Sequence, residues 1–330
     1  MPRILLVKTS SMGDVIHNFP VIADIRKHHP HATFDWVVEE GFAEIARLHP
    51  HIRDVIPVAI RRWRKHLLQT TTWGQIAGFR KHLKAQRYDY VLDTQGLVKS
   101  AVISRMADGS TYGQDRQSAR EPLAACLYEH RFYSGRQQHA VARNRELAAL
   151  ALGYPVPTAL PDYGLAGHPL KASNPHPALP ERYVVGLHAT SRNSKLWAVE
   201  HWITLGQHLH AQGYALLLPW ASDSEHARAA SIAQTTPGTI VLPKLGLTQL
   251  AGIIVGASAT VGVDTGLAHL AVALKCPTVA IYTDTDPLLT GIYPGSDTFA
   301  INLGGKAMPP TPQQVIQSLA SIMPLGNTHK

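Results

Sequence analysis

The stretch ILLVKTSSMGD, residues 4–14, begins as an apolar run and then becomes a polar loop that contains a glycine. The apolar run, Ile4 to Val7, has only four residues. A secretion signal needs about 7–15 apolar residues, and a membrane span needs about 20. We therefore expect a buried strand that ends in a loop, followed by a helix over residues 15–28.

The same alternation of short apolar runs and helical patterns continues along the chain. In the first half, further strands are expected at 34–39, 54–58 and 88–95, with a helix at 73–86. In the second half, strands are expected at 183–189, 214–220, 238–244 and 278–283, a strand that runs into a loop at 259–266, and helices at 199–212, 247–257, 267–275 and 312–323. Between the two series, residues 155–180 carry seven prolines and little periodicity, which is typical of a linker.

These patterns predict an α/β protein built from two Rossmann-like domains, whose parallel sheets face a central cleft. We expect an N-terminal domain over 1–160, a linker over 161–182, a C-terminal domain over 183–311, and a C-terminal helix and tail over 312–330. Ligands of open α/β sheets bind at the carboxyl ends of the strands, so the chemistry is expected in the strand-to-helix loops.

The charge of the chain is concentrated in its first half. Residues 1–160 hold 22 Lys and Arg against 14 Asp and Glu, whereas residues 161–330 hold nine of each. This excess indicates an anionic partner, which could be a phosphate, a carboxylate, a nucleic acid or an acidic membrane, or else simply a soluble basic surface. The two cysteines, Cys126 and Cys276, are far apart, and the 19 histidines show no ligand spacing. We therefore expect a cytoplasmic protein with no metal site.

Two kinds of role are open for Asp14, which stands near the start of the first helix, directly after Gly13. Asp is a favoured N-cap residue, and a carboxylate at a strand-to-helix loop is also placed to act as a base. Neither G-x-x-x-x-G-K-[ST] nor G-x-G-x-x-G is present at this loop, which argues against an NTPase or a standard dehydrogenase.

Two loops of the second half carry groups that suit a phosphorylated ligand. VDTGLAH, residues 263–269, delivers Asp264, Thr265, Gly266 and His269 where a strand meets a helix, and helix N-termini bind anions. HATSRNSKLW, residues 188–197, adds Thr190, Ser191 and Lys195, and a lysine there could neutralise a leaving diphosphate. Glu225 could accept hydrogen bonds from a ribose, although a first-turn glutamate also stabilises a helix by itself.

Four cations surround one tryptophan in IRRWRK, residues 60–65, and this run is expected in a loop. Arginine clusters bind carboxylates and phosphates through paired hydrogen bonds, although most charge runs are only solvated surface. Further cations expected in loops of the same domain are Lys99 and Arg120.

Seven blocks of this sequence together resemble the bacterial lipopolysaccharide heptosyltransferases of glycosyltransferase family 9. The blocks are VKTSSMGDVIH (7–17), FDWVVEEGF (34–42), IPVAIRRWRK (56–65), DTQGLVKSA (93–101), AREPLA (119–124), LHATSR (187–192) and VDTGLAHL (263–270). SMGD and DTGLAH mark the wider family, which has the GT-B fold. The longer blocks are similar to the members that add the first core heptose.

The resemblance implies an inverting transfer of heptose from ADP-heptose to Kdo2-lipid A, at the cytoplasmic face of the inner membrane, without a cofactor, a bound metal or a nucleic acid. Asp14 would be the general base, and Lys195 would assist at the donor phosphates. The donor site would further include Thr190, Ser191, Glu225, Leu245, Asp264, Thr265, Gly266 and His269, and the acceptor site would comprise Arg61, Arg62, Arg64, Lys65, Lys99 and Arg120.

The chain departs from the family pattern at a few positions. Ser191 stands where the family has a second threonine, Leu245 stands where it has a methionine near the adenine pocket, and residues 284–306 follow it too loosely to assign sites. Three other interpretations remain open: an enzyme that adds the second heptose, a basic nucleic-acid-binding protein, and a sugar epimerase of the same two-domain plan.

Overall fold

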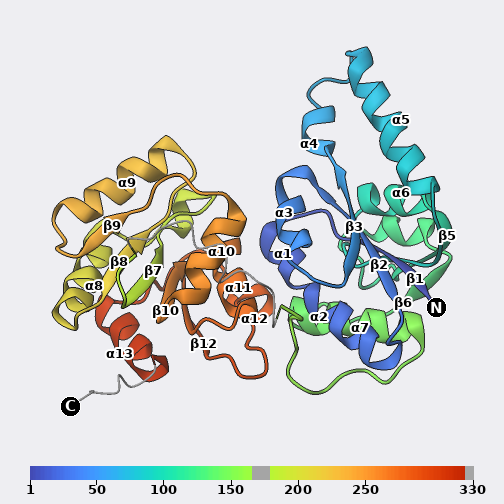
Figure 1. Ribbon diagram of the computed structural model, residues 1–330. Helices are drawn as coiled ribbons and strands as arrows, with labels where there is room; N and C mark the ends of the chain where they lie inside the picture. The colour runs from blue at the N-terminus through green and yellow to red at the C-terminus, as the bar shows by residue number, and fades with distance from the viewer. Residues whose placement is uncertain (166–178, 324–330) are drawn as a thin grey trace. The chain divides into compact units, whose positions relative to one another are not determined.

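The computed structural model describes residues 1–165 and 179–323. The chain divides into two compact units, unit 1 over Met1–His168 and unit 2 over Pro169–Lys330 (Figure 1). Most of the predicted linker, 161–182, and the predicted tail beyond residue 323 lie outside the described residues. The units are described separately below.

Unit 1 is a parallel sheet of six strands with helices on both faces (Figure 1). Its strand order is β3-β2-β1-β4-β5-β6, the order of a doubly wound Rossmann fold. Its strands are β1 (Arg3–Val7), β2 (Thr33–Glu39), β3 (Ile52–Val58), β4 (Arg87–Asp93), β5 (Asp108–Gln114) and β6 (His130–Phe132). Its α-helices are α1 (Met12–Ile16), α2 (Phe19–His28), α3 (Ala43–Arg47), α4 (Ile60–Trp63), α5 (Thr70–Lys84), α6 (Val98–Met106) and α7 (Ala140–Leu152).

The central strand β1 explains why the opening stretch is apolar without a break. Residues Ile4 to Val7 are all fully buried, because β1 pairs with β2 and β4 at its edges and helices cover both faces of the sheet. The helix expected over 15–28 is in fact two, α1 and α2, which are separated at His17 and Asn18. Pro20 lies in the first turn of α2, where the missing proline N–H costs no intrahelical hydrogen bond.

Unit 2 repeats the plan of unit 1 with a second parallel sheet, ordered β12-β11-β10-β7-β8-β9. Its strands are β7 (Tyr183–Leu187), β8 (Ala215–Leu218), β9 (Thr239–Val241), β10 (Ala259–Val263), β11 (Thr278–Tyr282) and β12 (Ala300–Gly304). Its α-helices are α8 (Val199–Ala211), α9 (Asp223–Gln234), α10 (Leu247–Gly256), α11 (Gly266–Ala273), α12 (Pro287–Thr290) and α13 (Pro312–Ile322). When the strands are counted from β7, their order is the same as in unit 1.

The last helix, α13, belongs to the core of unit 2. Its Val315, Leu319 and Ile322 pack in one buried cluster with Trp202 and Leu205 of α8. Burying apolar side chains of this size stabilises a fold by about 1.5–3 kcal/mol each, so α13 contributes substantially to this unit.

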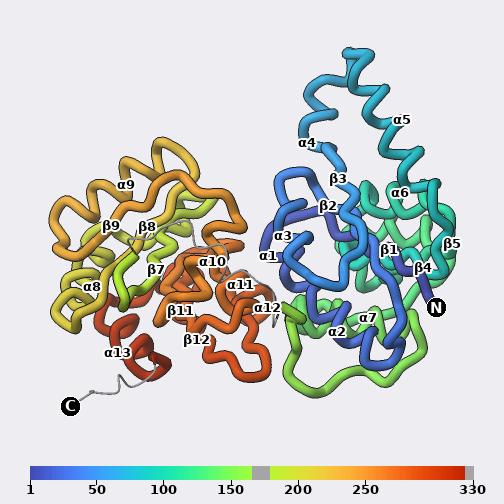
Figure 2. Tube along the Cα trace, in the orientation of Figure 1, coloured from blue at the N-terminus to red at the C-terminus, as the bar shows by residue number. Residues whose placement is uncertain are grey.

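Helices α4 and α5 project from the sheet of unit 1, as the chain trace in Figure 2 shows. The short helix α4 spans Ile60–Trp63, so the basic run expected in a loop begins as a helical turn. Trp63 and Phe79 are buried in the unit's core cluster and attach the base of the projection to the sheet. Most other residues of α5 are exposed.

Candidate functional site

The strand order of each sheet reverses at one point, and the loops at these two points carry the candidate residues. In unit 1 the reversal lies between β1 and β4, and in unit 2 between β7 and β10. Such switch points leave a crevice at the carboxyl ends of the strands, where doubly wound folds bind their ligands. The segments that follow β1, β7 and β10 hold Asp14, Lys195 and Asp264.

Asp14 lies in the first turn of α1, where its carboxylate caps the helix. Its Oδ2 accepts hydrogen bonds from the Ser11 backbone N–H (2.9 Å) and from the Ser11 hydroxyl (3.0 Å). The capping role considered from the sequence is therefore real. Both bonds use Oδ2, so the second oxygen of this half-buried carboxylate can still serve another partner.

Cations around Asp14 keep it ionised. Burial acts to raise the pKa of Asp14, but the charge of Lys8, the two hydrogen bonds from Ser11 and the charge of Arg120 outweigh burial and hold the pKa below its ordinary 3.8. Burial lowers the pKa of Lys8, a change that the charge of Asp14 opposes. Lys8 is only 4% exposed, and its Nζ donates to the Thr94 carbonyl (2.9 Å).

The loop that leads to Asp14 is held by the side chain of Gln95, which lies in the loop after the neighbouring strand β4. Its Oε1 accepts from Thr9 N (2.7 Å), Thr9 Oγ1 (3.1 Å) and Ser10 N (3.3 Å), and its Nε2 donates to Ser10 O (2.7 Å). Buried Asp93 at the end of β4 accepts in turn from Gln95 N (2.7 Å) and the Tyr128 hydroxyl (2.7 Å). The position of Asp14 thus depends on the pairing of β1 with β4.

A glycine is needed at the turn that follows Gln95. Gly96 has a φ of 67°, in the left-handed region, and a Cβ there would come within 2.5 Å of Gln114 Oε1. The DTQG sequence therefore supplies both the amide that holds the loop of Asp14 and the residue that lets the chain turn.

Three arginines extend the positive field beside Asp14. Burial lowers the pKa of Arg143, the charge of Asp14 acts to raise it, and the charges of Arg136 and Arg120 lower it further. The Arg143 Nε is buried without a hydrogen-bond partner among the described residues. Exposed Arg120 follows β5, and its carbonyl accepts from Arg136 Nη2 (3.2 Å). An anionic group bound next to Asp14 would satisfy these cations.

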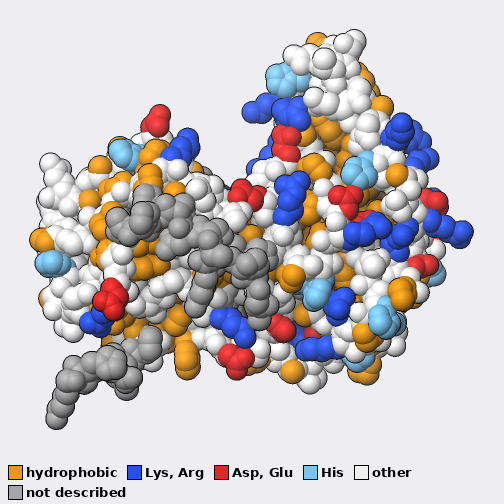
Figure 3. Space-filling model, viewed as in Figure 1, with side chains coloured by type: hydrophobic (Ala, Val, Ile, Leu, Met, Phe, Trp, Pro, Cys, Tyr) orange, Lys and Arg blue, Asp and Glu red, His pale blue; other side chains and the backbone are white. Residues whose placement is uncertain are grey.

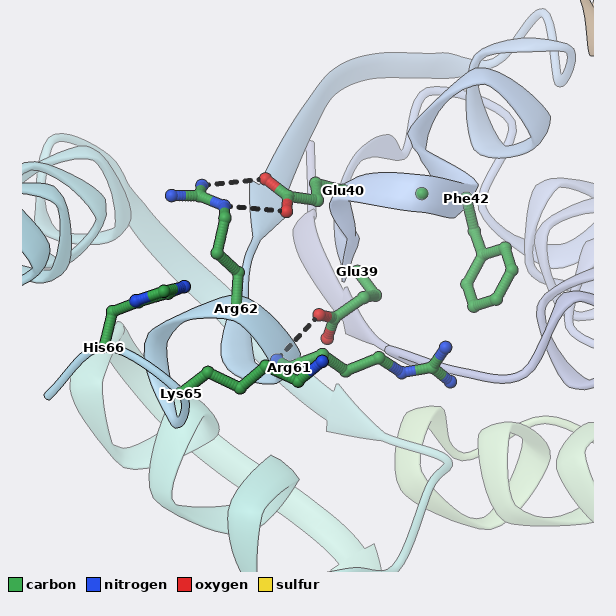
Figure 4. A pocket seen from close by; sticks show the side chains of 8 residues that line it. Glu39, Glu40, Phe42, Arg61, Arg62, Lys65 and His66 are labelled. Carbon is green, nitrogen blue, oxygen red and sulfur yellow. Dashed lines mark hydrogen bonds and ion pairs between the residues drawn. The ribbon is translucent and has the colours of Figure 1, made fainter.

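A pocket of about 460 Å³ opens at the base of the α4–α5 projection, lined by Glu39, Glu40, Gly41, Phe42, Arg61, Arg62, Lys65 and His66 (Figure 4). Arg62 is already engaged, because its Nε and Nη2 pair with the two oxygens of Glu40 (3.0 and 2.9 Å). Arg61 extends away from that pair, and its guanidinium lies 5.6 Å from the centre of the Phe42 ring. The backbone N–H of Arg61 donates to Glu39 Oε1 (3.0 Å), but the charged groups of Arg61 and Lys65 form no ion pair among the described residues.

Two other predicted acceptor residues lie on this unit. Arg64 is exposed directly after α4. Lys99 is exposed in the first turn of α6, so it lies on a helix and not in a loop as expected.

In unit 2, Asp264 connects the loops after β7, β10 and β11. Its Oδ2 accepts from Lys195 Nζ (2.6 Å) and from Thr285 Oγ1 (2.6 Å), and its carbonyl accepts from Thr190 Oγ1 (2.8 Å). Both members of the Lys195–Asp264 ion pair are mostly shielded, with 17% and 16% of their side chains exposed. The ammonium group is therefore held at the carboxyl edge of the sheet, where it can contact an anionic ligand.

The remaining predicted donor residues also lie in unit 2. Thr265 is the N-cap residue of α11, but its hydroxyl makes no capping hydrogen bond, and Gly266 begins that helix. His269 is buried on α11, Ser191 is exposed and Leu245 is half-buried. Glu225 caps α9, because its Oε2 accepts from Ala221 N (2.7 Å).

Several residues of these loops could not be found from the sequence. Gln95, Arg136 and Arg143 join the surroundings of Asp14, and Thr285 joins Asp264 from the segment for which no site was assigned. Ser194 also binds this segment, through its hydroxyl to Asp284 Oδ2 (2.6 Å). For Thr285, the sequence signal that could have indicated a site is the run of polar residues that follows β11.

Two features are absent from the described part of the chain. Residues 1–165 and 179–323 contain no cluster of three or more His, Cys, Asp or Glu side chains that could hold a metal ion. Among the same residues, no helix has both the length and the apolar character that crossing a bilayer requires.

Comparison with known proteins agrees with this geometry. Lipopolysaccharide heptosyltransferase 1 of Escherichia coli K12 is 46% identical over 292 residues, which cover 88% of this chain and 91% of that protein. The structure of E. coli heptosyltransferase WaaC with ADP superposes with a TM-score of 0.90 at 43% identity, covering 97% of this chain and 99% of that one. The same enzyme with ADP-2-deoxy-2-fluoro heptose gives 0.87 at 42% identity, with the same coverage.

The expected GT-B fold is confirmed by these matches. The model of glycosyltransferase family 9 (heptosyltransferase) matches residues 76–320, which include β4, β5 and β6 of unit 1 and all six strands of unit 2. The chain is therefore a member of glycosyltransferase family 9, the heptosyltransferases.

Proposed function

We propose that this chain transfers L-glycero-D-manno-heptose from ADP-heptose to the Kdo of Kdo2-lipid A, and so adds the first heptose of the lipopolysaccharide core. The observation that carries this proposal is the 46% identity to heptosyltransferase 1 over most of both chains. The surroundings of Asp14 support it, because a carboxylate kept ionised among cations suits an acceptor with carboxylates and phosphates.

Unit 2 would bind the donor. Lys195 would neutralise the charge that grows on the leaving ADP, and Asp264, itself held by the Thr285 hydroxyl, would keep its ammonium group in place. The N–H groups at the start of α11, from Gly266 onward, would bind phosphate oxygens. Glu225 has a second carboxylate oxygen available for the ribose hydroxyls while Oε2 caps α9. Thr190, Ser191, Leu245, Thr265 and His269 would complete the site.

Unit 1 would bind the acceptor and supply the base. The free oxygen of Asp14 would take the proton of the attacking hydroxyl as the new C–O bond forms, since a free alkoxide is inaccessible near neutral pH. A single displacement of ADP at the anomeric carbon inverts its configuration. Arg61, Arg64, Lys65, Lys99 and Arg120 would contact the acid groups of the acceptor, and Arg62 would act through its pair with Glu40.

The acceptor is a membrane lipid, so the enzyme would work as a peripheral protein on the cytoplasmic face of the inner membrane. The excess of Lys and Arg in residues 1–160 supports contact between unit 1 and an anionic surface. We propose that no protein-bound metal, cofactor or nucleic acid takes part.

Incubation of the purified chain with ADP-heptose and Kdo2-lipid A tests this function, with ADP release and product mass as readouts. One added heptose, and no ADP release without acceptor, would support it. Lipid that already carries one heptose is the matched control acceptor. Transfer to that control alone would replace the proposal with the second-heptose activity.

A further inference from the structure

The α4–α5 projection, residues 60–84, carries most of the net charge of the chain. It contains seven Lys and Arg and no Asp or Glu, while the whole chain has a net charge of +8. The seven are Arg61, Arg62, Arg64, Lys65, Arg80, Lys81 and Lys84. Blue side chains lie along both edges of the projection in the space-filling view (Figure 3).

Three large apolar side chains are exposed where α4 passes into α5. Leu67 is 49% exposed, Leu68 is fully exposed and Trp73 is 59% exposed. The Trp73 indole N–H donates to the Leu67 carbonyl (2.9 Å), so the three residues form one group, the apolar tip. Adjacent exposed apolar side chains on a projection mark a surface that binds another molecule.

The cations of the α4–α5 projection are available to an anionic partner. Among these seven cations, Arg62 alone forms an ion pair within the described residues, and its partner is Glu40, which directly follows β2. An apolar tip on a projection whose only charged side chains are Lys and Arg is complementary to a lipid bilayer that contains acidic headgroups. A protein partner would need a large acidic surface with an apolar centre, which is less common than an anionic membrane.

We propose that the apolar tip inserts into the interfacial layer of an anionic bilayer, while the cations of the α4–α5 projection contact the headgroups. The tip is continuous with the acceptor pocket, because Lys65 and His66 line that pocket and Leu67 follows directly. Insertion therefore places the pocket at the membrane surface, where the sugars of a lipid acceptor emerge. The choice of a membrane as partner rests on the proposed function.

The test uses the full chain and vesicles that contain no acceptor. Phosphatidylglycerol–phosphatidylethanolamine vesicles are compared with phosphatidylcholine vesicles by co-sedimentation. The double variant Leu67→Ser/Leu68→Ser is expected to partition into the anionic vesicles at least about tenfold less than the parent chain. Leu288→Ser/Leu289→Ser, at an exposed leucine pair of unit 2, is the matched control and should partition like the parent chain.

Fluorescence reports insertion directly. Trp73 is the one tryptophan among the exposed large apolar side chains of the described residues. Anionic vesicles should shift the emission to shorter wavelength, and lipids brominated near the headgroup should quench it. Trp73→Phe should remove this vesicle-dependent signal. Absence of quenching in the parent chain, or equal binding of both leucine variants, would overturn the proposal. A tip-dependent dimer seen by light scattering without vesicles would also overturn it, because the tip would then be covered by a second copy.

A second arm separates this inference from the proposed function. With a de-acylated, water-soluble acceptor, Leu67→Ser/Leu68→Ser should keep the kcat of the parent chain, whereas its rate on vesicle-embedded acceptor should fall about tenfold or more. Equal losses on both acceptors would show that the tip serves the reaction itself and would refute membrane insertion as its role. Failure of the parent chain on both acceptors would refute the proposed function, and vesicle binding would still decide the role of the tip.

Discussion

Replacing Gln95 with Met is expected to displace Asp14 without removing a charged group. Hydrogen bonds of the Gln95 amide tie it to Thr9 and Ser10, the shortest being 2.7 Å to Thr9 N and 2.7 Å to Ser10 O. Methionine has a similar length but no amide, so all of these hydrogen bonds are lost. Asp14 then depends for its position on Ser11 and the short helix α1.

The size of the effect follows from the number and burial of these bonds. A buried hydrogen bond contributes about 1 kcal/mol net, and water can replace some of them, so the free energy of unfolding should fall by about 2–4 kcal/mol. A displacement of a reacting group on the order of 1 Å costs about 100-fold in rate. We therefore expect kcat to fall about 100-fold, while the Kd for ADP-heptose, measured by calorimetry, stays the same.

The variant Gln95→Glu separates an effect on Asp14 from an effect on folding. The glutamate can still accept from Thr9 and Ser10, but it cannot donate to the Ser10 carbonyl, and its negative charge should raise the pKa of Asp14. The acidic limb of kcat against pH should then move to higher pH. Gln234→Met, at an exposed glutamine of unit 2, is the control. A Gln95→Met protein that is folded at the assay temperature and turns over within threefold of the parent chain would refute this reasoning.

Three further predictions concern single side chains. Asp14→Ala should lower kcat about 100- to 10,000-fold with the donor Kd unchanged, since general bases contribute that much; weak donor binding with normal turnover at saturation would contradict the assignment. Arg61→Ala and Arg64→Ala should each raise the acceptor KM about tenfold in titrations at saturating donor; a defect confined to the donor KM would contradict this. Burial and the charge of Arg228 lower the pKa of His188 to about 4. The unfolded chain, with an ordinary histidine pKa of 6.5, therefore binds a proton first, and stability should decrease as the pH falls from about 6.5 to about 4, by about 3 kcal/mol in total. Urea unfolding at several pH values would measure this slope; His188→Asn should flatten it, and an unchanged slope would refute the cause.

The expected strands that proved correct were those with strong apolar runs, such as β1 and β10. Strand β5 was not expected, because DGSTYGQ has small and polar residues where most of the other strands have Val, Leu or Ile. Helix α7 was not expected either, because it is alanine-rich and buried over most of its surface, which weakens the amphipathic signal.

The site could be predicted where residues follow one strand, and not where they meet across strands. Asp14, Lys195 and Asp264 follow strand ends, so their common position at the sheet edges was expected. The contact of Gln95 with Thr9 spans 86 residues and exists only because β1 lies beside β4. No local pattern encodes that neighbour, and the same reason explains why Thr285 was missed.

The shared strand order of the two sheets has a consequence for how this enzyme can diversify. Each sheet has its own six strands, its own buried core and its own loops at the point where the strand order reverses. Under the proposed function, acceptor preference and donor preference are then encoded in separate, non-overlapping halves of the gene. Recombination between relatives near the midpoint would exchange one preference while leaving the other intact.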